Sequence, residues 1–276
     1  MTTAPTRILS DGVPMPVVGF GTYPLEETDA EAAVRGALDV GYRLIDTAAS
    51  YGNEAAVGRA IAACGLPRAQ VFVTTKLRGR AHGYDETRRA YAESAARLGV
   101  DYVDLYLIHW PLPRLDRYTD SWRAMIDLRE EGLVRSLGVS NFTPRQIDRL
   151  YEETGVMPSL NQIEMHPYFP QPEQRAAHAA RGVATQSWSP LGRGSELLTE
   201  SVVIEAAHRH GVTPAQVVLR WHLQLDALPI PKSASPARQR ANLALFRFTL
   251  TETEVAALSA LARGRTGGDP DRHEEF

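Results

Sequence analysis

The chain has 276 residues, of which 43% are hydrophobic and 23% are charged. This length can bury a sizeable core in one large or two small domains. Because 30 Lys and Arg stand against 33 Asp and Glu, the formal net charge is -3, and the chain lacks the basic excess typical of nucleic-acid binding.

The single cysteine, Cys64, excludes an intramolecular disulfide framework and a zinc cage built from cysteines. No segment approaches the roughly 20 apolar residues of a membrane-spanning helix, and the first residues lack the apolar core of an export signal. No long Ser/Gly linker interrupts the sequence between Thr6 and Leu261. We therefore expect a single cytoplasmic domain over residues 1–276, without a nucleic-acid or membrane partner.

The chain begins with two short apolar stretches around Asp11-Gly12, which predict a β-hairpin over about residues 6–16. Apolar runs then recur at 17–20, 44–45, 71–73, 103–108, 137–139, 160–163, 184–188 and 228–230. Because these runs do not alternate apolar with polar residues, they are typical of parallel strands covered on both faces.

Helical patterns lie between the apolar runs. A capping box, in which a hydroxyl and a Glu or Gln satisfy free backbone donors, is predicted at Thr28–Glu31, Thr143–Gln146, Thr213–Gln216 and Thr251–Glu254. Further amphipathic segments occupy roughly 54–63, 84–98, 119–131, 171–180, 201–210 and 236–246.

Eight strands that alternate with helices over about 250 residues predict an α/β fold, a (β/α)8 TIM barrel. A doubly wound sheet is the alternative. The segment Gly19-Phe20-Gly21 is not a dinucleotide fingerprint, because the third glycine is missing and no helix is predicted to start there.

A polar side chain ends nearly every predicted strand. These residues are Thr22, Asp46, Lys76, His109, Ser140 with Asn141, Gln162, Trp188 with Ser189, and Lys232 with Ser233. The carboxyl ends of the strands of a TIM barrel converge at one face, where its active sites lie. We therefore predict one shared site at this face.

Four residues, Asp46, Tyr51, Lys76 and His109, predict acid–base chemistry. A tyrosine has a reference pKa of about 10, and a nearby lysine cation lowers the pKa of a phenol. The aspartate would neutralise the lysine, and a neutral histidine can orient a substrate oxygen. This set suits protonation of a carbonyl oxygen. It contains no nucleophile and no metal ligand set, so we expect a hydride from a cofactor.

The other strand ends suit a nicotinamide cofactor. Donors and acceptors for a carboxamide come from Ser140, Asn141 and Gln162, and a flat face for the ring comes from Trp188. A cationic cluster near a predicted helix N-terminus consists of Lys232, Ser233 and Arg238. Such a cluster suits a phosphate monoester and favours NADP(H) over NAD(H).

The sequence resembles the aldo-keto reductases over essentially its whole length. The resemblance is carried by three stretches, GYRLIDTAASYGNEAAVG at 41–58, LGVSNF at 137–142 and IPKSASPAR at 230–238 continuing to Asn242. Residues 73–76 and 107–111 agree as well. Trp188 stands where many animal members have tyrosine, so the chain looks more like the bacterial branch that includes 2,5-diketo-gluconate reductases.

The resemblance implies an NADP(H)-binding barrel, expected to be a monomer, that reduces aldehyde or ketone carbonyls to alcohols. It implies that Tyr51 is the proton donor, that Lys76 and Asp46 tune it, and that His109 orients the carbonyl. The implied cofactor-binding residues are Thr22, Asp46, Ser140, Asn141, Gln162, Trp188, Ser189, Leu191, Arg193, Lys232, Ser233, Arg238 and Asn242. The implied substrate-binding residues are Tyr23, Tyr51, His109 and Trp110.

Two further departures from the family pattern affect the cofactor and the pocket. Ala241 replaces a glutamate that many members carry before Asn242, which predicts looser adenine recognition. The segment 192–199 is short, and the polar tail 263–276 is expected either to fold over the mouth or to fray. From these departures we expect a more open pocket and less restricted cofactor exchange.

Two other functions are compatible with a barrel. The first is an NADP(H)-binding sensor or regulatory module with little turnover, although retention of all four catalytic side chains favours the enzyme. The second is a hydrolase, which would need another carboxylate facing Asp46, and no strand end supplies one.

Overall fold

The computed structural model describes residues 4–275. An N-terminal hairpin pairs β1 (Thr6–Ile8) antiparallel with β2 (Pro14–Pro16). At its turn Gly12 adopts a φ of +86°, a left-handed conformation that favours glycine. The predicted hairpin over about residues 6–16 is confirmed.

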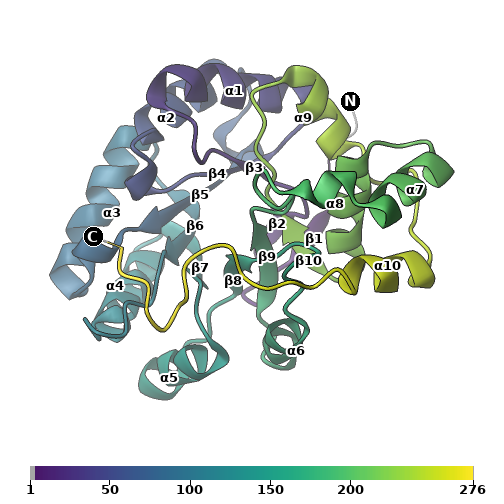
Figure 1. Cartoon of the computed structure of the whole chain (residues 1–276). Helices are drawn as coiled ribbons and strands as arrows, with labels where there is room; N and C mark the ends of the chain where they lie inside the picture. The colour runs from purple at the N-terminus through teal and green to yellow at the C-terminus, as the bar shows by residue number, and fades with distance from the viewer. Residues whose placement is uncertain (1–3, 276) are drawn as a thin grey trace.

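Within residues 4–275, eight parallel strands form one sheet in chain order. They are β3 (Phe20–Gly21), β4 (Leu44–Asp46), β5 (Phe72–Leu77), β6 (Val103–Ile108), β7 (Val134–Ser140), β8 (Leu160–Glu164), β9 (Ala184–Trp188) and β10 (Ala227–Pro229). Backbone hydrogen bonds from Gly19 to Pro229 (3.1 Å) and from Gly21 to Pro231 (3.2 Å) join the two ends of the sheet. The predicted (β/α)8 TIM barrel is confirmed, and Figure 1 looks into it.

Helices surround the strands. They are α1 (Glu27–Val40), α2 (Glu54–Ala63), α3 (Tyr84–Leu98), α4 (Tyr118–Glu130), α5 (Pro144–Thr154), α6 (Pro172–Ala180), α7 (Ser201–His210), α8 (Pro214–Gln224), α9 (Pro236–Leu243) and α10 (Glu252–Ser259). Short 3-10 turns are η1 (Ala49–Tyr51), η2 (Arg68–Gln70), η3 (Gly79–Ala81) and η4 (Glu196–Thr199). No helix in the described part of the chain is long and apolar enough to cross a membrane.

Three of the predicted capping boxes are present, at Thr143, Thr213 and Thr251. The box predicted at Thr28 is wrong, because α1 starts at Glu27, two residues before the start that a Thr28 cap implies, and its N-cap residue, Glu26, makes no side-chain cap. Tertiary contacts set this start. The Asn53 amide donates to the Leu25 carbonyl at 2.8 Å and fixes the chain just before the helix.

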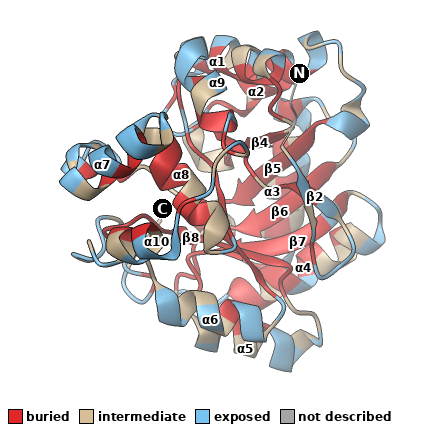
Figure 2. Cartoon of the chain, turned by 90° about the vertical axis from the view of Figure 1, so that its right-hand side faces the viewer, coloured by how far each residue is buried: buried red, intermediate tan, exposed pale blue. Residues whose placement is uncertain are grey.

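Apolar side chains fill the barrel and the layer beneath the helices. Figure 2 shows the buried residues along the strands and on the helix faces turned toward them. The hairpin contributes Leu9 and Met15 to a core cluster with barrel residues such as Leu44 and Leu105. The Ser136 hydroxyl of β7 also donates to Asp11 at 2.6 Å, so the hairpin closes the amino-terminal end of the barrel.

The opposite end of the barrel carries the carboxyl ends of the strands. Residues beyond α10 cross this end, and Figure 1 shows them as a yellow segment that runs from α10 toward α3 and α4. This crossing segment and the strand ends together bound the candidate site.

Candidate active site

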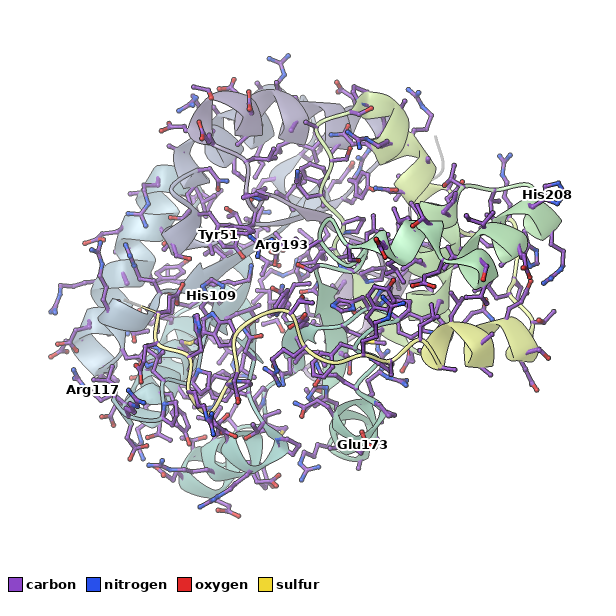
Figure 3. All side chains as sticks on the ribbon, viewed as in Figure 1. Tyr51, His109, Arg117, Glu173, Arg193 and His208 are labelled. Carbon is purple, nitrogen blue, oxygen red and sulfur yellow. The ribbon has the colours of Figure 1, made fainter. Side chains whose placement is uncertain are left out.

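A cavity of about 840 Å³ lies at the carboxyl ends of the strands. The predicted site residues that line it are Tyr23, Asp46, Tyr51, His109, Trp110, Asn141, Gln162, Trp188, Ser189, Leu191, Arg193 and Lys232. Figure 3 places Tyr51, His109 and Arg193 in this central region and His208 at the periphery. A volume of this size is typical of small-molecule sites.

The other predicted residues lie behind the cavity wall or beyond it. Thr22, Lys76 and Ser140 are buried, with at most 1% of each residue exposed. Ser233 and Asn242 are also buried, whereas Arg238 is exposed on α9. The structure therefore brings most of the predicted set to one cavity and places the α9 residues to one side of it.

Lys76 is the buried cation of the site. It lies one residue before the end of β5, and its Nζ donates to Asp46 Oδ1 on β4 at 2.6 Å and to the Thr47 carbonyl at 3.0 Å. A third bond runs to the Tyr51 hydroxyl at 3.2 Å. Burial opposes the charge, but Asp46 and Tyr51 outweigh it, so the pKa of Lys76 is raised. The lysine therefore stays cationic beside the phenol.

Tyr51, on η1, presents a half-buried ring to the cavity. Burial raises the pKa of Tyr51, and the Lys76 ammonium opposes this effect without reversing it. The sequence-based expectation of a lowered pKa is wrong for the net shift, because the phenol loses water as it gains the lysine. The phenol stays protonated near neutral pH. Since Lys76 donates to its oxygen, the phenol hydrogen is left for another acceptor.

His109 follows β6 and meets Tyr51 edge to face, with ring centroids 5.7 Å apart. Its Nδ1 lies 2.8 Å from Glu275 Oε1 and 3.3 Å from Ser50 Oγ. Its backbone carbonyl accepts from the Asn141 amide at 3.0 Å. The ring is thus held on its Nδ1 side, next to the phenol.

The three residues predicted to bind a carboxamide lie together beside Asp46. Asn141 Nδ2 donates to Ser140 Oγ at 3.0 Å, and Ser140 Oγ donates to the Gln162 carbonyl at 2.9 Å. Gln162 Nε2 donates to Asp46 Oδ2 at 2.7 Å. The Asn141 Oδ1 atom accepts from the indole of Trp188 at 2.8 Å.

Non-glycine residues with left-handed backbone gather at this face. Asn141 has a φ of +62°, Ser189 of +49° and Arg193 of +42°. Such conformations cost free energy and cluster at functional sites in proteins. The Arg193 guanidinium donates to the Tyr23 hydroxyl at 3.2 Å and lies over the tyrosine ring. The loop that contains Arg193 therefore contacts the side of the cavity that carries Tyr23.

A cationic surface lies where the chain enters α9. Ser235 is the N-cap residue of this helix, and Lys232 and Arg238 are exposed beside it. Within residues 4–275, neither cation forms an ion pair with a carboxylate. Unpaired cations at a helix N-terminus suit an anionic group.

The C-terminal segment also belongs to the site, which is one of the two alternatives that the sequence leaves open for the tail 263–276. No residue of the tail was predicted as a site residue. Glu164, at the end of β8, accepts from the backbone of Thr266 and Gly267 at 2.8 Å each. The His273 ring stacks on Trp110 with centroids 4.0 Å apart. The tail therefore folds over the mouth, and the expectation of a more open pocket is wrong on this side. Phe276 lies outside the described residues.

Comparisons with known proteins agree with this geometry. The model of the aldo/keto reductase family matches residues 17–263. The 2,5-diketo-D-gluconic acid reductase B of Corynebacterium sp. (strain SHS752001) is 54% identical, with 100% of both chains covered.

Solved structures extend the likeness to the fold. A crystal structure of a Gox0644 mutant in complex with NADPH has a TM-score of 0.94 and 40% identity, and the match covers 99% of this chain and 100% of that one. The Bombyx mori aldo-keto reductase in complex with NADP has a TM-score of 0.92 and 36% identity, with 98% and 97% covered.

Proposed function

The chain belongs to the aldo/keto reductase family, and from this premise we propose that it is an NADPH-dependent oxidoreductase that reduces aldehyde or ketone carbonyls to alcohols. One observation carries the proposal. A buried, cationic lysine lies 3.2 Å from the hydroxyl of Tyr51, which lines a cavity of small-molecule size. A buried ion pair such as that of Lys76 and Asp46, placed beside a cavity, is typical of a functional site.

The cavity and its surroundings fit NADP(H). Spare hydrogen-bonding capacity lies behind the cavity wall, because Thr22 Oγ1 and, beside Gln162, Gln186 Nε2 are buried without a partner. The carboxamide would be held by Ser140, Asn141 and Gln162, and the nicotinamide ring would stack on Trp188. The pyrophosphate would lie along Ser189, Leu191 and Arg193, and the 2'-phosphate end would be held by Lys232, Ser233, Arg238 and Asn242.

Bound NADPH supplies the hydride for the carbonyl carbon. The Tyr51 hydroxyl donates its proton to the carbonyl oxygen, where negative charge develops. Lys76 stabilises the phenolate that remains, and Asp46 holds Lys76 in place. His109 orients the carbonyl oxygen, while Tyr23 and Trp110 line the route to the reacting carbon.

The test is NADPH consumption with aldehydes, diketones and keto-sugars, measured for the wild type and for Tyr51→Phe. We expect turnover to fall roughly 10²- to 10⁴-fold in the variant, the usual contribution of a general acid, with unchanged NADPH affinity. The matched control is Tyr151→Phe, because Tyr151 is exposed on α5. Unchanged turnover in Tyr51→Phe would contradict the mechanism.

The alternative is an NADP(H)-binding sensor or regulatory module. Tight NADPH binding without turnover on any carbonyl in the panel would favour it. We also propose that residues 1–276 act as one domain and as a monomer in the cytoplasm, in keeping with the composition and the lone Cys64. Sedimentation velocity measures the oligomeric state.

A further inference from the structure

A carboxylate from the C-terminal tail occupies the His109 side of the active-site cavity. Glu275 lines this cavity, and its Oε1 lies 2.8 Å from Nδ1 of His109. Its Oε2 accepts from the Gly79 backbone at 3.1 Å, and a further hydrogen bond comes from the side chain of Ser50. The Glu275 side chain is only 13% exposed. The three donors, from Ser50, Gly79 and His109, belong to separate segments of the barrel mouth and are called the carboxylate cradle below.

The docked carboxylate of Glu275 is ionised. Burial opposes its charge, but the interactions with His109, Ser50 and the Gly79 backbone outweigh this effect and lower the pKa of Glu275. An ionised carboxylate has no hydrogen to donate and can only accept. In a neutral His109 ring the hydrogen therefore lies on Nδ1.

This hydrogen on Nδ1 prevents His109 from holding a carbonyl. A neutral imidazole carries one ring hydrogen, so Nε2 can only accept when Nδ1 carries it, and a carbonyl oxygen also only accepts. Moving the hydrogen to Nε2 would leave Nδ1 and the Glu275 carboxylate as two acceptors 2.8 Å apart. Facing acceptors without a hydrogen between them are unfavourable in a buried place. Docking of Glu275 and binding of a carbonyl by His109 therefore exclude each other.

A separate anchor holds the tail before it reaches the cradle. The Glu164 carboxylate, 2% exposed, accepts from the backbone of Thr266 and Gly267 at 2.8 Å each and from the Thr266 hydroxyl. Gly267 and Gly268 then connect this anchor to the segment that ends at Glu275. Because glycine backbone has the greatest conformational freedom, the pair can act as a hinge. Glu275 can thus leave the cradle while the tail stays attached at Glu164.

This inference rests on the proposed reductase function. We propose that the carboxylate cradle is a binding site that the chain fills with its own Glu275, and that the docked tail is an inhibited form of the enzyme. His109 holds a carbonyl substrate only in molecules whose Glu275 has left the cradle. The Glu164 anchor keeps Glu275 close by, so docking is reversible and competes with the substrate. A small free carboxylate is the external ligand that the same three donors would take.

Competition by Glu275 predicts a specific change in the kinetics. When only the undocked fraction binds substrate, the apparent affinity falls by that fraction, so a tail docked in about nine of ten molecules raises KM about tenfold. Glu275→Ala should therefore lower the KM for diacetyl about tenfold and leave kcat nearly unchanged. Diacetyl is a small neutral diketone, so the charge of Glu275 does not itself repel it.

Two further variants separate docking from general effects on the tail. Glu274→Gln is the matched control, because it removes the same charge from the neighbouring residue, which pairs with Arg114, and its KM should equal that of the wild type. Gly79→Ala displaces the tail without changing Glu275, since a Cβ there would lie 1.9 Å from the Glu275 carbonyl oxygen, and it should lower KM as well. An unchanged or higher KM in Glu275→Ala would overturn the proposal.

Acetate tests the cradle itself, because it replaces the group that Glu275→Ala removes. It should inhibit Glu275→Ala competitively with diacetyl and leave the wild type unaffected at the same concentration, where Glu275 already fills the cradle. Acetamide, which has the same shape without the charge, should inhibit neither protein, and chloride at equal ionic strength is the salt control. Acetate that inhibits both proteins alike, or neither, would contradict the carboxylate-binding site.

A third readout needs neither substrate nor cofactor. The imidazole nitrogen resonances of His109, assigned with His109→Asn, report which ring nitrogen carries hydrogen. We expect hydrogen on Nδ1 alone in the wild type and a tautomer mixture that includes Nε2–H in Glu275→Ala. The same spectrum in both proteins, or a doubly protonated ring in the wild type, would overturn the proposed inhibition.

Failure of this inference is distinguishable from failure of the reductase proposal. Absence of turnover by the wild type and by Glu275→Ala on every carbonyl would contradict the reductase proposal itself. If the wild type reduces diacetyl and Glu275→Ala does so with the same KM, Glu275 is not an inhibitor and the reductase proposal stands.

Discussion

The ammonium of Lys76 donates to the oxygen of Tyr51 at 3.2 Å and leaves the phenol hydrogen free. The same ammonium lies 2.6 Å from Asp46 Oδ1, and neither Lys76 nor Asp46 is more than 2% exposed. The ion pair of Lys76 and Asp46 is therefore shielded from bulk water near the carboxyl ends of two neighbouring strands, β5 and β4. This arrangement couples the stability of the barrel mouth to the chemistry of the phenol.

Lys76→Met should lower both stability and turnover. Removing one partner of a buried ion pair leaves the Asp46 charge uncompensated and costs about 3–5 kcal/mol. Turnover should fall because the phenolate loses its neighbouring cation. Urea unfolding and NADPH consumption measure the two effects. The double variant Lys76→Met with Asp46→Asn should regain stability but not activity, and recovery of activity would contradict the role given to Lys76.

Arg238→Ala should weaken NADPH binding and leave NADH binding unchanged. A hydrogen bond to a charged group contributes about 1.5–3 kcal/mol, so the Kd for NADPH should rise roughly ten- to hundredfold. Arg240→Ala is the matched control, because Arg240 is another exposed arginine of α9. Fluorescence titration gives both constants. Equal loss of NADPH and NADH affinity would place Arg238 away from the 2'-phosphate.

The strand ends could be predicted from the sequence because each follows its own apolar run. Asp46 ends β4, Lys76 lies one residue before the end of β5 and His109 follows β6, and parallel pairing of these strands brings their side chains together. The topology of a barrel therefore converts local positions into a site. No knowledge of loop conformation is needed for these three residues.

The tail could not be predicted in the same way. The contact of Glu164 with Thr266 joins residues 102 positions apart, and no periodicity or motif in the tail marks it. The start of α1 was mispredicted for a related reason, because a distant amide, that of Asn53, fixes the preceding loop. The pKa direction of Tyr51 depends on burial, which the pattern of residue types does not contain.

Trp188 should report cofactor binding. Its indole donates to Asn141 Oδ1 at 2.8 Å, and the proposed carboxamide contact needs that same amide. We therefore expect NADPH to displace this hydrogen bond and to change the tryptophan fluorescence. Stopped-flow fluorescence of the wild type and of Trp188→Phe measures it. Trp122→Phe is the control, since Trp122 is buried on α4. An unchanged signal in Trp188→Phe would assign the fluorescence change to another tryptophan.

Buried histidines should make the fold sensitive to acid. Burial lowers the pKa of His82 and His178 to about 4 and that of His222 to about 3. His222 shows why the ring stays neutral. Its Nε2 donates to the Pro190 carbonyl and its Nδ1 accepts from the Ser187 hydroxyl, each at 3.0 Å. A second proton on the ring is disfavoured because the buried imidazolium would lose its hydration, and this effect outweighs the bond to Pro190, which favours the charged form.

The direction of the effect follows from the two pKa values of each ring. In the unfolded chain a histidine has a pKa of about 6.5, so the unfolded state binds protons first as the pH falls. Stability is therefore full above about pH 6.5 and is lost as the pH falls toward the folded values, by about 1.4 kcal/mol per pH unit for each ring. Urea unfolding between about pH 7 and about pH 5 measures this slope. His178→Gln should lower the slope of the free energy of unfolding against pH by the contribution of about one proton. A free energy of unfolding that stays constant over this range would show that the histidine rings are not buried in neutral form.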